Sequence, residues 1–169
     1  MEHELNLDRL PSALMSRDGW SDFLESRRPA EPHLHQIEPT NHCPYTCRMC
    51  PRTNLMTRSL GFMDLDLYHK VMEDVAGYSE PVRSMEIELF HFGESLLHPR
   101  IHEMVGIASS LGLKATLSVN APHLTPERID SILARDPFRL IISFDGYDRE
   151  SYQRIRGRAA DYDKAVRHI

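Results

Sequence analysis

Apolar positions along residues 34–169 follow two alternating spacings, one typical of strands and one typical of helices. Short apolar or alternating runs predict four strands, at residues 34–40, 84–92, 113–119 and 138–144. Apolar residues at helical spacing predict helices at residues 64–76, 101–112, 125–133, 149–155 and 161–169. Regular alternation of strand and helix favours an α/β fold in which crossover helices join parallel strands.

Local signals mark the ends of several predicted helices. Acidic residues open the helix that begins at Asp64, and Gly77 follows its last turn. Thr125 followed by Pro126 is typical of an N-cap and a first helical turn. These signals support the helix boundaries independently of the apolar spacing.

The alternation ends after four βα units, too few to close a barrel. We therefore predict a partial (β/α) barrel, about four units of an expected six, with helices outside the parallel strands. Two more units would need ~60 further residues, so we expect the N-terminal part of a longer protein; otherwise residues 140–144 would form an open apolar edge. Glu86 and Glu88 should face a wet lumen or form ion pairs, because an unpaired buried carboxylate is costly.

Residues 1–33 form a predicted helical lead-in and linker, ahead of a core domain at residues 34–169. Trp20, Phe23 and Leu24 fall at helical spacing, which predicts a short amphipathic helix around residues 16–27. Prolines in the segment 29–32 then end the helix and stiffen the link.

Composition narrows the class of protein. A chain of 169 residues with 41% hydrophobic and 27% charged residues fits one soluble domain with a real core. A net charge of −5 argues against nucleic acid or an anionic membrane as a partner. No apolar run approaches the length of a membrane span, and the acidic start does not resemble a secretory signal. We expect a cytoplasmic protein.

The three cysteines of the chain lie within eight residues, at Cys43, Cys47 and Cys50. Three thiolates leave one position of a metal centre free for a small molecule, whereas structural zinc sites use four ligands. A zinc site would have to recruit His35, His42 or His91, and the chain has no second cysteine pair. Two alternatives stay open: a zinc- or iron-sulfur-binding α/β module without catalysis, and a one-electron carrier.

Small and polar residues follow each predicted strand, where the loops of a parallel α/β fold converge. Any one of them could be a simple turn or cap residue. Together with the cysteines they predict one site. The residues concerned are Asn41, Gly93, Glu94, Ser118, Asn120, Ser143 and Asp145.

Several segments resemble the radical S-adenosylmethionine (SAM) enzyme superfamily. The cysteine spacing resembles its CxxxCxxC signature, and the segment from Phe92 to Pro99 is similar to its GGEP-type segment. Residues 142–146, with Tyr152 and the run 155–157, resemble an ISxDG…Y…IRG stretch of the branch that often carries SPASM or twitch extensions. The resemblance covers residues 34–169.

The resemblance implies that Cys43, Cys47 and Cys50 ligate three irons of a 4Fe-4S cluster and that SAM chelates the fourth. It implies that reductive cleavage of SAM yields a 5′-deoxyadenosyl radical that abstracts hydrogen from a substrate. The expected partners are a one-electron donor, such as flavodoxin or ferredoxin, and a substrate of the peptide or protein class.

The same resemblance implies contacts to SAM. Gly93 and Glu94 would hold the methionyl ammonium, and Met49 would pack on adenine in place of the usual aromatic residue. Phe92 and Ser95 replace a glycine and a proline of the family pattern. Residues implied to lie near SAM or the substrate are Ser118, Asn120, Ser143 and Asp145.

Overall fold

The computed structural model describes residues 17–169, which fall into two units that divide between Pro32 and His33. The first unit contains helix α1 (Arg17–Glu25), in agreement with the predicted lead-in helix. Within it, the rings of Trp20 and Phe23 meet edge to face at 5.7 Å, and the Arg27 guanidinium lies 4.6 Å from the Phe23 centroid. The predicted domain boundary between residues 33 and 34 stays a prediction, and residues 1–16 lie outside the described part.

The second unit is built on a parallel sheet with the order β1-β2-β3. Its strands are β1 (Glu86–Glu88), β2 (Lys114–Asn120) and β3 (Arg139–Ser143). The predicted first strand is reduced to a parallel bridge beside β1, where the Ile37 N–H donates to the Glu88 carbonyl at 2.9 Å. The predicted α/β class with parallel strands is confirmed.

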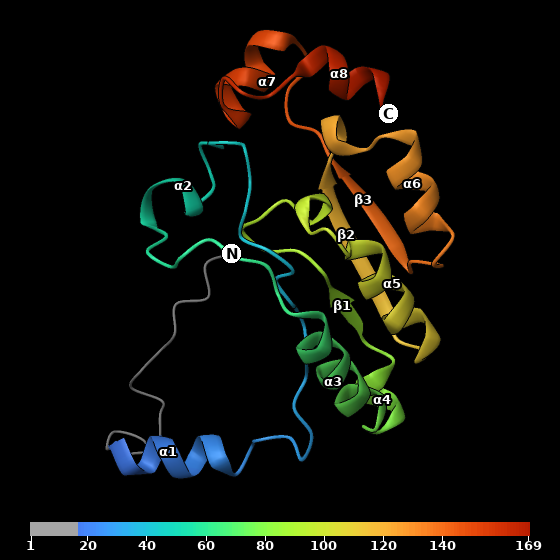
Figure 1. The fold of residues 1–169 in the computed structure, drawn as a ribbon. Coiled ribbons are helices and arrows are strands. Elements are labelled where there is room, and N and C mark those ends of the chain that lie inside the picture. Colours follow the sequence, from blue (N-terminus) through green and yellow to red (C-terminus); the bar gives the residue numbers. More distant parts are fainter. Residues whose placement is uncertain (1–16) are drawn as a thin grey trace. The chain divides into compact units, whose positions relative to one another are not determined.

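Three helices lie along one face of this sheet (Figure 1): α3 (Leu65–Ala76), α5 (Ile101–Ser110) and α6 (Pro126–Leu133). The side chain of Asp64 accepts hydrogen bonds from the N–H groups of Asp66 and Leu67, and Thr125 accepts one from the Arg128 N–H. The N-cap predicted at Thr125 is therefore present, and Asp64, predicted only as an acidic residue at the helix start, is the N-cap of α3. None of the described helices combines the length and apolar character needed to cross a bilayer.

The remaining elements are short. The pattern did not predict α2 (Arg52–Leu55), α4 (Glu80–Arg83) or the 3-10 turns Ser95–Leu97 and Ala121–His123. After β3 come α7 (Arg149–Arg156) and α8 (Tyr162–Arg167), close to the two predicted helices. In Figure 1 these two helices lie beyond the carboxyl ends of the strands.

The core lies between the sheet and its helices. Met72, Met104 and Leu117 are each 0% exposed, and the buried Tyr68 hydroxyl donates to the Met104 carbonyl at 3.0 Å. The three strands pair in parallel above this apolar layer, so their carboxyl ends lie at one edge of the sheet.

The opposite face of the sheet carries the carboxylates that we expected to be solvated or paired. Glu86 of β1 forms an ion pair of 3.1 Å with Arg139 of β3 and accepts a hydrogen bond from Thr116 of β2, which lies between them. Glu88 accepts from the Gln36 side chain at 3.0 Å. The prediction of ion pairing at these positions is confirmed for Glu86.

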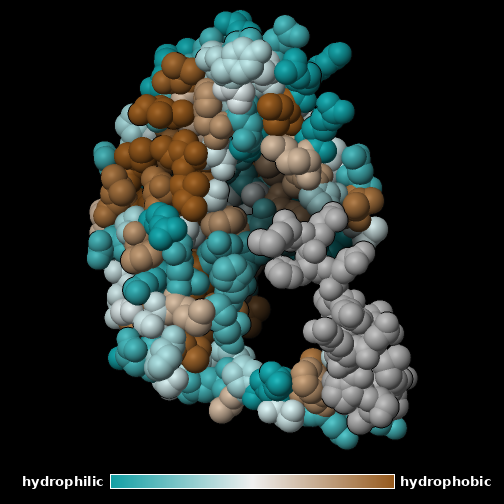
Figure 2. All heavy atoms as spheres, turned by 180° about the vertical axis from the view of Figure 1, so that it is seen from behind, coloured by the Kyte–Doolittle hydropathy of each residue, from teal (hydrophilic) through white to brown (hydrophobic). Residues whose placement is uncertain are grey.

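The outer edge of β3 is open in the part of the chain that the structure describes. Ile141 and Ile142 are 38% and 36% exposed, although the apolar run predicted a strand covered on both faces. No described strand pairs with β3 on the side away from β2, and this missing neighbour explains the exposure. Seen from behind, hydrophobic side chains gather along this flank (Figure 2).

Candidate functional site

A cavity of about 190 Å³ opens at the carboxyl ends of the strands. Most of the predicted site residues line it: Cys43, Cys47, Met49, Cys50, Gly93, Ser118, Asn120 and Ser143. The other lining residues are Phe90, His91, Phe92, Val119 and Arg156. The fold thus brings the cysteine loop together with the ends of three strands, as the sequence predicted.

The cysteine loop is held from its own C-terminal side by Arg52. The Arg52 guanidinium donates to the Cys43 carbonyl at 2.9 Å and to the Tyr45 carbonyl at 2.7 Å. Both acceptors are neutral backbone carbonyls, so they do not neutralise the positive charge of Arg52. The partners of Arg52 are backbone atoms, so no pattern in the sequence indicates these contacts.

The turn after β1 packs directly on the chain that leads into the cysteine loop. A Cβ on Gly93 would lie 1.8 Å from the Thr40 carbonyl oxygen, far inside van der Waals contact. The next residue, Glu94, donates its N–H to the His42 carbonyl at 2.8 Å. Only glycine fits here, because the two backbones touch.

The C-terminus of α7 contacts the other side of the same loop. The Arg48 N–H donates to the Ile155 carbonyl at 2.8 Å, and the Cys47 thiol donates to the Arg156 carbonyl at 3.7 Å. Gly157 has a φ of 94°, and a Cβ there would lie 2.3 Å from Oγ1 of Thr46. The loop is therefore held between the turn after β1 and the end of α7.

Glu94 lies behind the cavity wall rather than in its surface. Glu94 is 1% exposed, and its Oε1 accepts a hydrogen bond from the Leu96 N–H at 3.0 Å. Oε2 accepts from the Asn120 N–H at 2.8 Å and from the Asn120 side-chain amide. Burial raises the pKa of this carboxyl, and the hydrogen bonds from Leu96 and Asn120 oppose that shift.

Arg156 extends this network to Asp145. Its guanidinium donates to Oδ1 of Asn120 at 2.6 Å and forms an ion pair with Asp145. The Nε–H of Arg156 is buried and has no hydrogen-bond partner within the described residues. An unpaired buried donor costs about 1–3 kcal/mol, so a bound acceptor would relieve it. Asp145 itself does not line the cavity, unlike the other predicted residues at the ends of β2 and β3.

Arg156 was visible in the sequence as part of the matched stretch, but it carried no predicted role. Its partners Asn120 and Asp145 lie on two other segments, and Asn120 is 36 residues away. A buried arginine between two strand ends can be recognised only after those ends have been brought together.

The three cysteines are free thiols. Burial raises the pKa of Cys43 and of Cys47, whereas the charges of Arg52 and Arg156 respectively act in the opposite direction. A metal centre would remove these protons, because coordination deprotonates a thiol outright. The soft thiolate set, the cavity beside it and the unpaired Arg156 donor all fit an iron-sulfur cluster with an open vertex.

The zinc alternative needs side chains that converge on one ion. Among residues 17–169, no three His, Cys, Asp or Glu side chains do so. His42 instead stacks on Phe62 with ring centroids 4.5 Å apart, and His35 lies 3.7 Å from the Glu88 carboxylate. A cluster has no such requirement, since its thiolates bind different irons.

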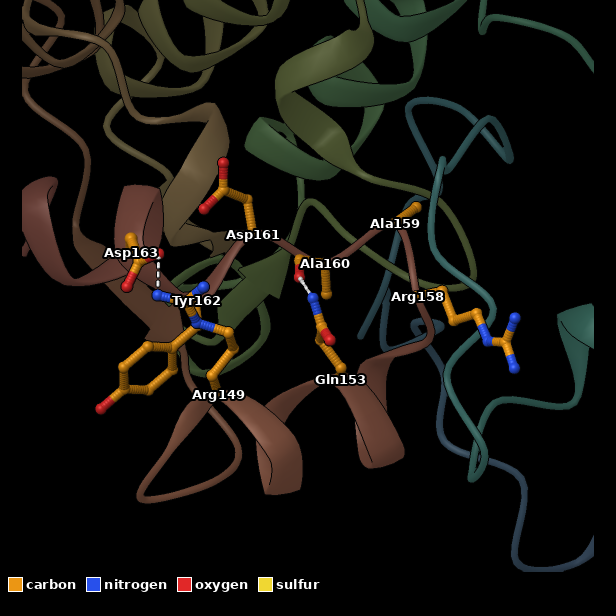
Figure 3. Close-up of a pocket in the computed structure, with 8 residues that line it drawn as sticks. All are labelled: Arg149, Gln153, Arg158, Ala159, Ala160, Asp161, Tyr162 and Asp163. Atoms are coloured by element: carbon orange, nitrogen blue, oxygen red, sulfur yellow. Dashed lines mark hydrogen bonds and ion pairs between the residues drawn. The ribbon is translucent and has the colours of Figure 1, made fainter.

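A second cavity, of about 270 Å³, lies between α7 and α8 and contains none of the predicted site residues (Figure 3). Its polar groups pair with one another: Arg149 with Asp163 at 2.6 Å, and the Gln153 amide with the Ala160 carbonyl at 3.4 Å. In Figure 3 the Arg158 side chain points away from this ion pair. The cavity therefore offers no convergent set of free polar groups.

Comparison with protein families gives one match over most of the chain. The family model described as the radical SAM superfamily matches residues 37–169. An AdoMet-dependent heme synthase from Methanosarcina barkeri is 25% identical over 138 residues, which are 82% of this chain and 38% of that protein. A PqqA peptide cyclase from Bradyrhizobium diazoefficiens is 27% identical over 121 residues, 72% of this chain and 30% of that protein.

Solved structures share the fold. Streptococcus suis SuiB bound to the precursor peptide SuiA superposes with a TM-score of 0.65 at 17% identity, over 89% of this chain and 33% of that one. BtrN in complex with AdoMet and 2-DOIA gives a TM-score of 0.58 at 20% identity, over 80% of this chain and 55% of that one. The chain spans only 38% and 35% of the two AdoMet-dependent heme synthases that it matches.

Proposed function

The chain belongs to the radical SAM superfamily, and we propose that the cavity at its strand ends holds a 4Fe-4S cluster and SAM, the two cofactors that this family uses. One observation carries the proposal. Cys43, Cys47 and Cys50 line the same cavity as Gly93 and Asn120, although these two groups lie more than 40 residues apart in the sequence. The three thiolates would hold three irons and leave the fourth open toward the strand ends.

The strand-end residues would bind the methionyl part of SAM. The backbone at Gly93 faces the cavity, and the Glu94 carboxylate lies one layer behind it. A buried carboxylate so close to the wall favours a cation on the cavity side, since charges interact strongly where water is excluded. We therefore assign the ammonium to the Gly93–Glu94 turn, with Asn120 held in place by Glu94.

The remaining wall residues would contact the rest of SAM or the substrate. Met49 lines the cavity and is 59% exposed, so its flexible thioether can pack on a purine. The hydroxyls of Ser118 and Ser143 lie 3.0 Å apart across β2 and β3 and can turn toward a ligand. Asp145 would act through Arg156, its ion-pair partner.

With both cofactors bound, the chemistry supplied is the reductive cleavage of SAM to a 5′-deoxyadenosyl radical that abstracts hydrogen from a substrate. The contribution of the chain is placement and exclusion of water. Phe90 and Phe92, together with Met49 and Val119, supply the apolar part of the cavity lining beside the polar strand ends. We propose that the whole protein is an enzyme of this kind.

We further propose a peptide or protein substrate and a one-electron donor such as flavodoxin or ferredoxin. The substrate class is supported by the names of two similar proteins, a PqqA peptide cyclase and SuiB bound to a precursor peptide. We place the protein in the cytoplasm, because a reducing compartment keeps its free thiols available to a cluster.

Anaerobic reconstitution of the full-length protein with iron and sulfide tests the proposal. We expect about four irons and four acid-labile sulfides at this site per chain, binding of SAM, and formation of 5′-deoxyadenosine after reduction. One zinc per chain without acid-labile sulfide would instead identify a zinc-binding α/β module. A cluster that binds no SAM would identify a one-electron carrier.

Glu94→Gln is expected to keep the colour of the cluster and to weaken SAM binding about tenfold, the loss of roughly one charge-assisted contact. The substitution removes the negative charge behind the Gly93 turn and turns one acceptor that faces Asn120 into a donor. Equilibrium binding of SAM to the reconstituted protein measures the effect.

Glu103→Gln is the matched control, because Glu103 lies on the surface of α5 and pairs with Arg100. It should leave the SAM affinity unchanged. An unaltered affinity in Glu94→Gln would show that the ammonium does not lie at this turn.

A further inference from the structure

Arg156 contacts both halves of the proposed site through different parts of the same residue. Its backbone carbonyl accepts from the Cys47 thiol, and its guanidinium bridges Asn120 and Asp145 at the ends of β2 and β3. Its side chain is only 11% exposed, so solvent screens its charge weakly. Among residues 17–169, no other residue that lines the cavity is hydrogen-bonded or ion-paired to both the cysteine loop and the strand ends.

We propose that Arg156 is a positioning residue that ties the cysteine loop to the strand-end wall and, through its charge, stabilises the reduced state of the cluster. The inference rests on the proposed function, because it assumes a cluster at Cys47. It goes beyond that function by assigning a redox-tuning role to a residue that is not a ligand.

The positioning half of the proposal follows from the contacts around the loop. The end of α7 holds the loop at Arg48 and at Cys47, and Gly157 allows Thr46 to approach. The Arg156 side chain anchors this helix end to Asn120, which is itself fixed by Glu94. The cysteine loop and the strand ends are thus joined by one short chain of hydrogen bonds through Arg156.

The electrostatic half follows from the balance of charge around the cavity. Glu94 and Asp145 bring two carboxylates to this region, and Arg156 is the cation in hydrogen-bonded contact with their network. Reduction adds one negative charge to a cluster, and a nearby cation favours that state whereas a carboxylate opposes it. Removing Arg156 should therefore make reduction harder, and removing the Asp145 charge should make it easier.

Loss of the Arg156 charge and loss of the Asp145 charge should shift the midpoint potential in opposite directions. Damage to the fold has no reason to depend on the sign of the lost charge, so the two variants distinguish electrostatics from misfolding. Arg156→Gln should shift the cluster midpoint potential to a more negative value and raise the SAM dissociation constant about tenfold. Asp145→Asn should shift the midpoint potential to a more positive value. Arg156→Lys keeps the positive charge but loses the planar set of guanidinium N–H donors. The midpoint potential of the cluster should therefore stay near that of the wild type, while SAM binding weakens.

The measurement is a redox titration of the reconstituted full-length protein, followed by its visible absorption, with SAM binding measured in parallel. Arg154→Gln is the matched control, since Arg154 lies on the exposed side of α7 and pairs only loosely with Glu150 at 3.7 Å. It should change neither quantity.

Opposite shifts in Arg156→Gln and Asp145→Asn would establish the role. An unchanged or more positive potential in Arg156→Gln, or a potential in Asp145→Asn that moves to a more negative value, would overturn it. If Arg156→Gln fails to fold, Asp145→Asn and Arg156→Lys still decide: a positive shift in the first and a wild-type potential with weaker SAM binding in the second support the role, and any other result overturns it. A wild-type protein that takes up no cluster would instead refute the proposed function.

Discussion

Cys47→Ala is expected to abolish the visible charge-transfer absorption of the reconstituted protein and to remove most of its iron and acid-labile sulfide. Cys47 is the middle thiol of the three and is 9% exposed, held between the turn after β1 and the end of α7. With only two thiolates left, a cluster with an open vertex would lose one of its three protein anchors, and residues 1–169 contain no fourth cysteine that could replace it.

The control for this substitution separates loss of a ligand from loss of the fold. Without metal, Cys47→Ala should cost only about 1 kcal/mol of unfolding free energy, because it removes one small side chain and one weak thiol hydrogen bond. Met49→Leu changes an exposed apolar side chain of the same loop and should keep the absorption. Full cluster content in Cys47→Ala would refute the ligand assignment.

Gly93→Ala is expected to lower the unfolding free energy by about 3 kcal/mol and to prevent SAM binding. The added Cβ would lie 1.8 Å from the Thr40 carbonyl oxygen and 2.6 Å from the Thr40 carbonyl carbon. Both atoms belong to the backbone, so no side-chain rotation can relieve the overlap. Either the turn or the start of the cysteine loop has to move, and the cavity wall moves with it.

Gly61→Ala is the matched control, because a Cβ at Gly61 would meet nothing within 4 Å. Thermal or denaturant unfolding of both variants, together with SAM binding, measures the difference. Equal stability and equal SAM affinity in the two variants would contradict the close approach of the Gly93 turn to Thr40.

The helices show how far local pattern reaches. Helix α3 occupies Leu65–Ala76, close to the prediction at residues 64–76, because its apolar stripe, its Asp64 cap and Gly77 all lie within one segment. The predicted strand boundaries were less accurate. Residues 84–92 predicted a long strand, but β1 covers only Glu86–Glu88, because pairing with β2 ends there and the chain turns to form the cavity wall.

For the site, the sequence predicted which residues would meet but not how each side chain would be placed. The cysteine spacing and the polar strand ends indicated which residues would meet, because parallel strands joined by helices must end at one edge. Sequence reasoning did not indicate that Glu94 lies behind the wall, that Arg52 caps the loop, or that Arg156 bridges Asn120 and Asp145. The open apolar edge of β3 was expected for a chain of only four βα units, but the apolar run itself predicted a strand covered on both faces.

The sequence by itself therefore determined the α/β class, most helix positions and the set of residues that gather around the cysteines. These features depend on periodicity, capping and spacing, which act over a few neighbouring residues or follow from topology. Packing between distant segments decided the role of each side chain within the site. Contacts such as Gly93 on Thr40, or Arg156 on Asn120, join positions more than 30 residues apart, and no local pattern records them.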